Sequence, residues 1–526
     1  MTDHLLVRHE TFSSLMKQIS ILFIIASFVI DVNGQCGMDG NWLLGWNTTK
    51  HYGTLIKFKD SKAKKYKVKL YKNVGKYSAM ISNKNGEILL YGNGCVIADS
   101  TFDEIENGNG INDISASAFK DCYTLENLGH SGWMQDCLFI PCDDIDSCFL
   151  YIYKPRNVYK PNTPYVDKIA LAKILRNPDG IYKVVTKDSV FYNKKNTTSG
   201  LNILKKSNSK NWWLTSASDS VNALLVFEVE GANIKFKEKQ YFKEITPDRQ
   251  NSVCAKFSAQ GDLYAVYDVP LDSANCWVRL FSFDRSIGEF KYLQSWSVPF
   301  QKSLSGGVEF SGSGRYLYVS SAVKIFQYDL WAADIPSSVE TVAEYDGFQE
   351  LGFAGNFFYP QRAPDCRIYI NSSSSLKYLH YIDKPEVKGI GCNVMQHALE
   401  LYEWHSGSIP YYPNYRLDTG CPVCDSTIGL PDPVATQSVP LSRGFIKVYP
   451  NPASSWVNIL PLAGTLQSEG EIDIISSTGT HILTQAIDQT GSKIELDISS
   501  WPIGMYVVLY KQRGKLLQSE KFVITK

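Results

Sequence analysis

The chain has 526 residues, of which 44% are apolar and 13% aromatic, and this length and composition allow about two to four domains with large cores. Its 53 basic and 53 acidic side chains cancel, which argues against the strongly basic surface of a nucleic-acid-binding protein. The 31 tyrosines favour β-strands.

The N-terminal region has the pattern of a targeting signal. A single positive charge after Met16 precedes a short apolar run at 19–30, and Val32 and Gly34 occupy the small-residue positions of a cleavage site. We predict a secretory signal peptide over residues 1–34, with Met16 as the more natural start. The alternative is an uncleaved membrane anchor, although the apolar run is short for a bilayer span.

All 12 cysteines lie beyond this signal, and an even number of cysteines in an exported chain predicts disulfides. Four of them lie close together in the sequence and are expected to form local bridges in long loops: Cys122, Cys137, Cys142 and Cys148. Cys421 and Cys424 are predicted to form a disulfide in a linker. Half of a zinc site or a redox pair is the alternative, but no second cysteine or histidine pair lies nearby.

The body of the chain, residues 35–418, repeats one pattern of short strands. The clearest copy is Gly307–Leu330, where apolar residues alternate with polar ones around a Ser-Gly-Ser-Gly turn. Phe257–Asp284 repeats this pattern, and looser copies occur at 80–91 and 364–382. One such meander cannot bury both of its faces, whereas several packed radially can. We therefore predict an all-β protein whose body is a β-propeller with about seven blades.

The remaining elements of the body follow in chain order. Further strand pairs are expected at 41–58, 76–94, 137–154, 168–192 and 212–229, with a polar loop at 99–121. Residues 395–401 are expected either to complete the last blade or to meet the N-terminal strand and close the ring, which would remove exposed sheet edges.

A lysine-rich stretch lies in the first of these regions. It contains Lys57, Lys59, Lys62, Lys64, Lys65, Lys67, Lys69 and Lys72. The simpler interpretation is a solvated or edge strand, on which lysines prevent the addition of further strands. The alternative is a patch that binds an acidic glycan or lipopolysaccharide.

The composition changes after the body. Residues 419–444 are predicted to be an extended linker, because this region is rich in Pro, Ser, Thr, Asp and Gly without periodicity. Residues 445–526 then contain seven short stretches of strand character, which predict a small Ig-like β-sandwich. The expected strands are 446–449, 456–460, 471–476, 481–486, 493–497, 504–511 and 515–524.

This last segment carries a recognisable set of motifs. They include Tyr449, Pro450, Asn451 and Pro452 at its start, Gly504 and Tyr506 near its end, and the terminal Lys526. In their order and spacing they closely resemble the type A C-terminal sorting domain of the type IX (Por) secretion system of Bacteroidetes. The resemblance implies that the chain engages the type IX secretion machinery through this domain, and is then released or attached to the cell surface. An ordinary Ig-like accessory domain is the alternative.

The body is similar to a group of propeller-like surface and gliding-motility-associated proteins that carry the same sorting domain. The similarity rests on residues 81–91, 307–311, 383–389 and 408–413 and implies a fold and a location but no reaction. Cys366 departs from the pattern, because the repeat usually has Gly after Pro-Asp. We expect a disulfide to staple this turn instead.

The sequence offers little catalytic chemistry. HExxH, GxSxG, Walker, Rossmann and sialidase motifs are absent, so we predict no catalytic, cofactor-binding or metal-binding residue. His397 and His405 are expected to be core or loop residues. Asp143, Asp144 and Asp146 are expected to form a turn rather than a calcium site. Four aromatic residues could form a platform for a sugar, although core positions are more common: Trp212, Trp213, Tyr411 and Tyr412.

We therefore predict a secreted or surface-attached, non-catalytic propeller that binds an extracellular glycan or protein. It is expected to need no cofactor, to bind no nucleic acid, and not to be an integral membrane protein. Two alternatives stay open. One is a polysaccharide-processing enzyme with a pair of carboxylates at the channel mouth. The other is a structural component of the surface or gliding apparatus.

Overall fold

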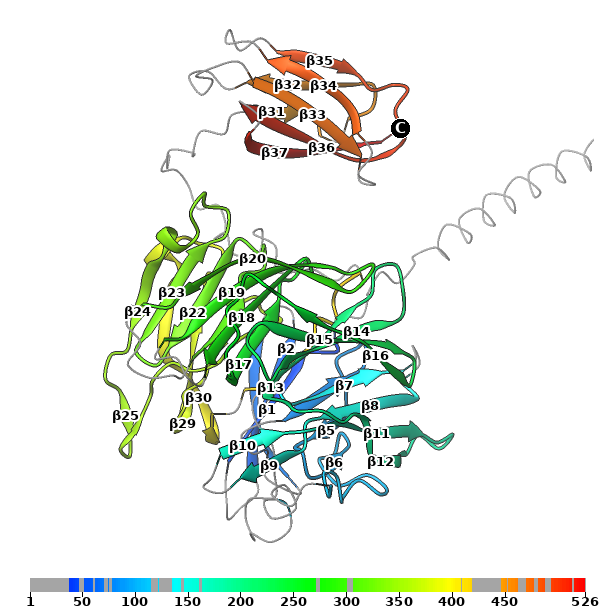
Figure 1. Ribbon diagram of the computed structural model, residues 1–526, viewed down its shortest axis with the longest axis vertical. Coiled ribbons are helices and arrows are strands. Elements are labelled where there is room, and N and C mark those ends of the chain that lie inside the picture. The colour runs from blue at the N-terminus through cyan, green and yellow to red at the C-terminus, as the bar shows by residue number, and fades with distance from the viewer. Residues whose placement is uncertain are drawn as a thin grey trace, which may run out of the picture. The chain divides into compact units, whose positions relative to one another are not determined.

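The computed structural model describes most of the chain in two compact units, Met1–Leu430 and Pro431–Lys526. The described residues are 37–46, 52–59, 62–70, 74, 78–114, 122, 135–142, 146–159, 163–270, 275–299, 306–407, 409–418, 446–451, 453–461, 470–476, 481–487, 493–512 and 515–525. Strands make up almost all of their regular structure, as Figure 1 shows, and the prediction of an all-β protein is confirmed. No helix in these ranges is long and apolar enough to cross a bilayer.

Among the described residues, the first unit contains seven antiparallel sheets of three or more strands. The first two are β1 (Asn41–Leu44), β2 (Tyr52–Lys59) and β3 (Lys62–Lys69), then β4 (Ala79–Ser82), β5 (Ile88–Gly92) and β6 (Ile97–Ala98). The third is β7 (Cys137–Pro141), β8 (Cys148–Tyr153), β11 (Ile169–Arg176) and β12 (Tyr182–Tyr192). The fourth is β13 (Asn196–Lys205), β14 (Trp212–Ser218), β15 (Ala223–Glu230) and β16 (Asn233–Tyr241), extended by β10 (Thr163–Val166) and β9 (Arg156–Tyr159).

The last three sheets have four strands each. The fifth is β17 (Gln250–Phe257), β18 (Leu263–Pro270), β19 (Trp277–Asp284) and β20 (Glu289–Ser297). The sixth is β21 (Gly306–Phe310), β22 (Tyr316–Ser321), β23 (Lys324–Asp329) and β24 (Glu340–Glu344). The seventh is β27 (Pro360–Arg362), β28 (Ile368–Ile370), β29 (Ser375–Ile382) and β30 (Val394–Ser406). A small hairpin, β25 (Gln349–Glu350) and β26 (Phe353–Ala354), lies between the last two.

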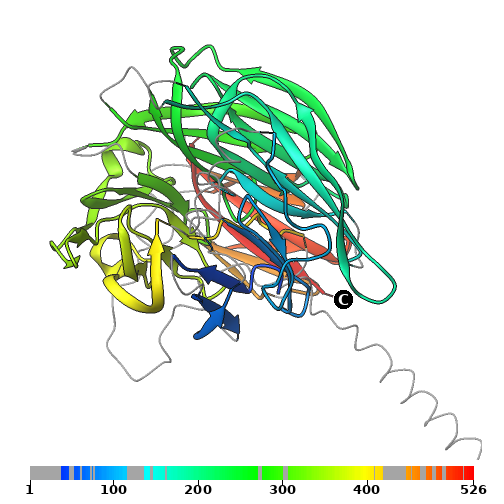
Figure 2. The same cartoon turned by 90° about the horizontal axis from the view of Figure 1, so that it is seen from below.

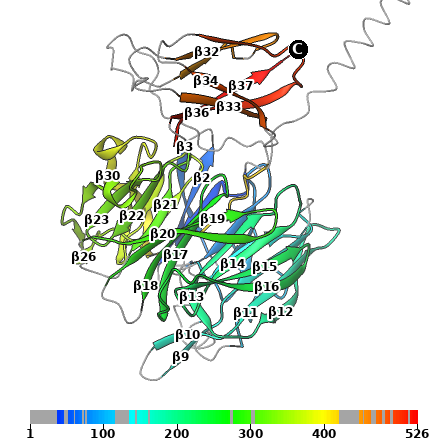
Figure 3. The ribbon, with the colours of Figure 1, turned by 45° about the horizontal axis from the view of Figure 1, so that its top comes forward.

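These sheets follow one another in chain order around an axis. Most successive sheets contact each other through their first strands; β13 contacts β17, for example, and β17 contacts β21 (Figure 3). The third and fourth sheets contact each other through their last strands, β12 and β16. The last sheet contacts the first, so the ring closes. This arrangement confirms the propeller class. The count of about seven blades stays a prediction, because the first two sheets have three strands each in the described residues.

Ring closure depends on β30, which fulfils both expectations for this region. It pairs with β29 in the seventh sheet, and it also lies beside the strands of the first sheet (Figure 2). The backbone N–H groups of Tyr402 and Glu403 donate to Thr54 Oγ1 of β2 at 2.9 and 3.2 Å. The N–H of Trp46 donates to the carbonyl of Trp404. The first and last sheets therefore close the ring by lying side by side.

The predicted repeats fold as sheets, although the strands of the clearest copy are buried on both faces rather than at alternate residues. Gly307–Leu330 supplies most of β21 and all of β22 and β23. Apolar residues of one face, such as Val308 and Leu317, share a core with the fifth sheet, and those of the other face, such as Tyr318, pack with the seventh sheet. The segments at 137–154 and 168–192, which the sequence suggested as separate pairs, form one sheet. Its register places Ala170 opposite Tyr153 and Leu175 opposite Cys148.

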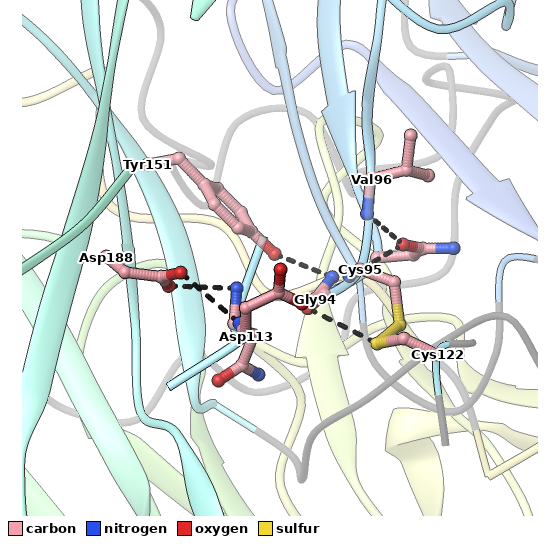
Figure 4. Close-up of a disulfide and its surroundings, with 9 residues drawn as sticks. Gly94, Cys95, Val96, Asp113, Cys122, Tyr151 and Asp188 are labelled. Atoms are coloured by element: carbon pink, nitrogen blue, oxygen red, sulfur yellow. Dashed lines mark hydrogen bonds between the residues drawn. A yellow bond between two sulfur atoms is a disulfide. The ribbon is translucent and has the colours of Figure 1, made fainter. Parts of the chain in front are cut away.

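The cysteines differ in part from the prediction. Cys122 bonds to Cys95, with 5.4 Å between their Cα atoms, so the expected local bridge to its downstream neighbours is wrong (Figure 4). Around this disulfide the Gly94 N–H donates to Tyr151 Oη at 3.0 Å, so the loop is tied to β8. The staple expected at Cys366 is confirmed, since this residue is disulfide-bonded. The predicted pair Cys421 and Cys424 lies outside the described residues.

Several other cysteines are buried free thiols: Cys137, Cys254, Cys276 and Cys392. Each of these thiols is packed in a hydrophobic core cluster of the first unit. Burial raises the pKa of Cys254 and of Cys392 to about 11. These thiols therefore behave as core residues, although the chain is exported.

The second unit is a two-sheet sandwich, as predicted. One sheet has β31 (Ile446–Tyr449), β32 (Trp456–Pro461) and β35 (Ile494–Asp497); the other has β33 (Gly470–Ser476), β34 (His481–Ile487), β36 (Gly504–Gln512) and β37 (Lys515–Ile524). Alternate residues of these strands, such as Ile472, Ile474 and Phe522, form one core. Each strand begins and ends within about two residues of its predicted position.

Candidate functional site

The axis of the first unit is occupied by its last described segment, residues 409–418, which we call the plug. Its tyrosines bond to the first strands of three different sheets. The Tyr411 hydroxyl donates to Asn202 Oδ1 of β13, and the Tyr412 hydroxyl donates to the carbonyl of Asn41 in β1. The Tyr415 hydroxyl donates to the carbonyl of Phe139 in β7 at 2.7 Å.

The three tyrosines of the plug are buried, and burial raises the pKa of each hydroxyl well above its usual value. The suggested sugar platform is therefore wrong, because its four aromatic residues are all buried. Trp212 packs edge-on against Tyr415 at 6.1 Å, and the Trp213 indole donates to the carbonyl of Arg285 at 2.8 Å. Carbonyl and amide oxygens of the chain accept the hydrogen bonds of the plug tyrosines and of Trp213, so these rings can be buried at little cost.

A cavity of about 60 Å³ remains beside the plug, between β17, β21 and β27. It is far smaller than a typical ligand pocket and has room only for a few water molecules. The lining includes two carboxylates, Asp39 and Glu309. Lys256 Nζ lies 3.4 Å from Glu309 Oε2, and Arg416 Nε and Nη2 of the plug each donate to Asp39 at 2.8 Å. Each carboxylate in this cavity is thus paired with a cation.

A wider groove, of about 750 Å³, lies between the outermost strands β16 and β20. Its lining combines charged and aromatic side chains, including Tyr241, Lys243, Glu289, Lys291 and Tyr292. The side chain of Tyr241 is 66% exposed. We call this surface the outer groove.

The two strands of the outer groove are fixed to each other by Gln240. Its Nε2 donates to the carbonyl of Gly288 at 2.9 Å, and its Oε1 accepts the Phe290 N–H at 2.8 Å. Lys239 lies over the Tyr241 ring at 5.2 Å and 2.9 Å from Asp219 Oδ1. Burial acts to lower the pKa of Lys239, but its contact with Asp219 raises that pKa overall. The exposed ring is therefore held in place beside fixed charges.

Three histidines gather in the seventh sheet, and two of them are deeply buried. Burial lowers the pKa of His380 to about 3 and that of His405 to about 4. His405 Nε2 lies 3.0 Å from the carbonyl of Tyr378, and His397 Nε2 lies 2.8 Å from Asp346 Oδ2. His405 is therefore a core residue, as expected, whereas His397 lies partly exposed in strand β30 and not in a loop.

Metal-binding chemistry has no visible basis in the described part of the chain. These residues include no group of three or more His, Cys, Asp or Glu side chains arranged to hold a metal ion. The suggested calcium turn cannot be placed, since Asp143 and Asp144 lie outside the described ranges.

In the second unit, Asn451 joins the two ends of the sorting motif, 70 residues apart. Its Nδ2 donates to the carbonyl of Lys521 at 2.9 Å, and its Oδ1 accepts the Val523 N–H at 3.0 Å. Tyr449 and Pro450 beside it are exposed. The start of the motif is thereby fastened along the last strand, β37.

The other end of the motif contributes to the core. Tyr506 is buried, stacks on Phe522 at 5.5 Å, and donates to the carbonyl of Pro502 at 2.9 Å. Gly504 has a φ of 156°, a conformation that favours glycine. Pro452 and Lys526 lie outside the described residues.

Replacing Asn451 by Ala is expected to lower the free energy of unfolding of the second unit by about 1–2 kcal/mol, because two hydrogen bonds to β37 are lost. The urea midpoint of that unit measures the change. Gln485→Ala, which removes an exposed polar side chain from β34, is the matched control and should change the stability by less than about 0.5 kcal/mol. Equal midpoints for both variants would show that Asn451 does not fasten the motif.

Comparisons with known proteins give different results for the two units. Among curated proteins we find no match. The chain resembles several solved structures. One is a protein from Bacteroides uniformis described as a putative 6-phosphogluconolactonase, with 12% sequence identity, a TM-score of 0.41, and coverage of 70% of this chain and 98% of that chain. Another is the periplasmic gluconolactonase of Pseudomonas aeruginosa (12% identity, 70% and 97% coverage, TM-score 0.36). We assign neither activity to the present chain on this likeness.

The second unit has a specific match. Residues 447–525 match the family described as the secretion system C-terminal sorting domain. This range includes the Asn451 fastening and the Tyr506 core contact described above. The chain therefore carries a type IX C-terminal sorting domain, and it is exported and then secreted or attached at the outer-membrane surface.

Proposed function

We propose that this chain is a non-catalytic β-propeller that binds an extracellular glycan or protein after export. The observation that carries this proposal is the plug. Propellers commonly offer a site around their axis, and here the axis is occupied by Tyr411, Tyr412 and Tyr415 of the same chain. A ligand would therefore bind on the outer surface. We also propose that residues 1–34 are a signal peptide and that residues 419–444 are a linker.

The pairing of carboxylates beside the plug supports the non-catalytic role. Glycoside hydrolysis needs two carboxyl groups that can act as acid and as base or nucleophile, about 5–9.5 Å apart. Asp39 and Glu309 are each engaged by a cation, so neither is available for this work. A polysaccharide-processing enzyme is therefore the weaker of the two candidates.

The outer groove supports binding over a purely structural role. Its volume lies in the range of ligand sites, and an exposed ring flanked by donors and acceptors is the arrangement that suits a sugar. The Tyr241 ring would pack against the apolar face of a pyranose. Lys243, Glu289 and Lys291 would then bond to its hydroxyl groups.

Affinity electrophoresis of the chain from Gln35 onward, through gels cast with different neutral polysaccharides, tests this proposal. Retardation is expected in at least one gel. Tyr241→Ala should weaken binding roughly three- to tenfold through the lost ring contact. Trp331→Ala, which removes another exposed ring (70% exposed) from the turn after β23, is the control and should migrate like the wild type. Free migration of the wild type in every gel would exclude glycan binding at this groove and leave a protein as the partner.

A further inference from the structure

A second charged surface lies on the β2–β3 hairpin, which Figure 3 labels. Lys57 and Lys59 of β2 and Lys64 and Tyr66 of β3 are exposed. Lys57 Nζ lies over the Tyr66 ring at 5.8 Å, so these side chains share one side of the hairpin. We call this surface the lysine face. It belongs to the first sheet, whereas the outer groove lies between the fourth and the fifth.

The register of the hairpin places like charges opposite each other. Lys57 pairs with Lys64, and Lys59 pairs with Lys62. Directly opposite residues of an antiparallel pair have Cβ atoms about 4.5–5.5 Å apart, and like charges there are destabilising. The hairpin therefore places the exposed side chains of Lys57 and Lys64 in repulsion, which a bound anion would relieve.

Two lysines of the opposite side of β3 are, in contrast, bonded to other parts of the chain. Lys65 donates to the carbonyl of Glu400, and Lys67 Nζ lies 2.7 Å from Glu403 Oε1. Strand lysines elsewhere also have acidic partners: Lys183 with Glu106, Lys235 with Glu230, and the less exposed Lys324 with Glu344. Lys57, Lys59 and Lys64 have no acidic partner among the described residues.

Protection of a sheet edge explains only part of this arrangement. β3 is the edge strand of its sheet, and its lysines would prevent the addition of another strand. Lys57, however, lies on the central strand, between Asn41 of β1 and Lys64 of β3. An edge needs no lysine there, so a charge-complementary ligand is the better explanation.

We propose that the lysine face binds an anionic polysaccharide, an extended sugar chain that carries carboxylate or sulfate groups. Successive lysines on one side of a strand repeat at about 6.6–6.8 Å, so the face presents a regular array of cations to a polyanion. The ammonium group is a point charge without a fixed fork geometry, which suits charged groups on a flexible chain. Tyr66 offers an apolar ring, 46% exposed, to a sugar between those groups.

The test uses the chain from Gln35 onward and titrates it with dextran sulfate and with polygalacturonate, at rising NaCl concentrations. Neutral dextran is the uncharged reference. The triple variant Lys57→Gln/Lys59→Gln/Lys64→Gln should bind the anionic polymers at least about tenfold more weakly and with a shallower dependence on salt, because fewer counterions are released. The control variant Lys183→Gln/Lys235→Gln/Lys324→Gln removes the same number of charges from paired strand lysines and should bind like the wild type.

Melting curves separate lost binding from lost folding. The triple variant is expected to melt no lower than the wild type, because like-charge repulsion has been removed. Equal weakening in the triple and control variants, or no binding of the wild type to either anionic polymer, would overturn the proposal. Binding to phosphatidylglycerol vesicles without binding to the polymers would overturn it in favour of a lipid surface. Tyr241→Ala should leave dextran sulfate binding unchanged, so this proposal and that of the outer groove fail independently.

Discussion

Replacing Lys256 by Met is expected to lower the free energy of unfolding of the first unit by about 3–5 kcal/mol, since Glu309 would stay buried without its cation. Both side chains are almost completely buried beside the plug. Met preserves most of the volume of the lysine stem, so the loss would report the charge rather than a cavity. The urea midpoint of the first unit's transition measures it.

A double-mutant cycle completes this experiment. Glu309→Gln alone should also be costly, whereas the double variant Lys256→Met/Glu309→Gln should lose less than the sum of the single losses, by about 1–3 kcal/mol. The control is the exposed pair Lys183 and Glu106, whose disruption should cost less than about 1 kcal/mol. If Lys256→Met were as mild as Lys183→Met, the buried pair would not hold the interior around the plug together.

Acidification from pH 7.5 to pH 5 is expected to cost the first unit about 4 kcal/mol through His380 and His405. Their pKa values are lowered by burial to about 3 and about 4, whereas the unfolded chain binds these protons near pH 6.5. The unfolded state therefore binds more protons, and the stabilisation that is complete above pH 6.5 declines as the pH falls below it. Each histidine contributes about 2 kcal/mol of this loss at pH 5.

Urea midpoints of the wild type and of His380→Gln, measured across this pH range, test the prediction. His380 Nδ1 accepts a hydrogen bond from the backbone N–H of His397 at 3.0 Å. The side-chain oxygen of glutamine can accept the same bond, but glutamine does not titrate. The variant should therefore lose less stability on acidification, and other titrating groups cancel in the comparison. His481→Gln lies at an exposed position of the second unit, so it should leave the pH dependence of the first unit's stability unchanged. Parallel curves for His380→Gln and the wild type would contradict the prediction.

Strands whose two faces have different surroundings could be predicted closely from the sequence. In the second unit Ile472 and Ile474 point inward and alternate with polar neighbours, so a period of two residues marks the strand and its limits. A period of two residues also indicated β21, β22 and β23, although both faces of these strands are buried. It does not say which strands pair, because pairing depends on contacts between distant segments. For this reason the sequence pattern suggests the hairpins at 137–154 and 168–192 as separate pairs, although they form one sheet.

The plug could not be predicted in the same way. Residues 409–418 have no periodic pattern, and their tyrosines are held by carbonyl and amide groups of β1, β7 and β13, more than 200 residues earlier in the chain. A cluster of three tyrosines with two prolines was the available signal, and we considered two of them, Tyr411 and Tyr412, as part of a possible sugar platform. The lysine face was visible as a run of residues. Only the strand register showed which lysines lack partners.

The position of the plug near the end of the first unit has a consequence for shortened polypeptides. It is the last described part of the first unit, so a polypeptide that stops before residue 409 leaves the polar groups of the inner strands without the hydroxyls that satisfy them. The sorting domain comes later still, at 447–525. Every chain that carries its export address has therefore already received the segment that seals its interior. Because the sorting signal lies at the C-terminus, we expect only chains that already contain the plug to be exported through it.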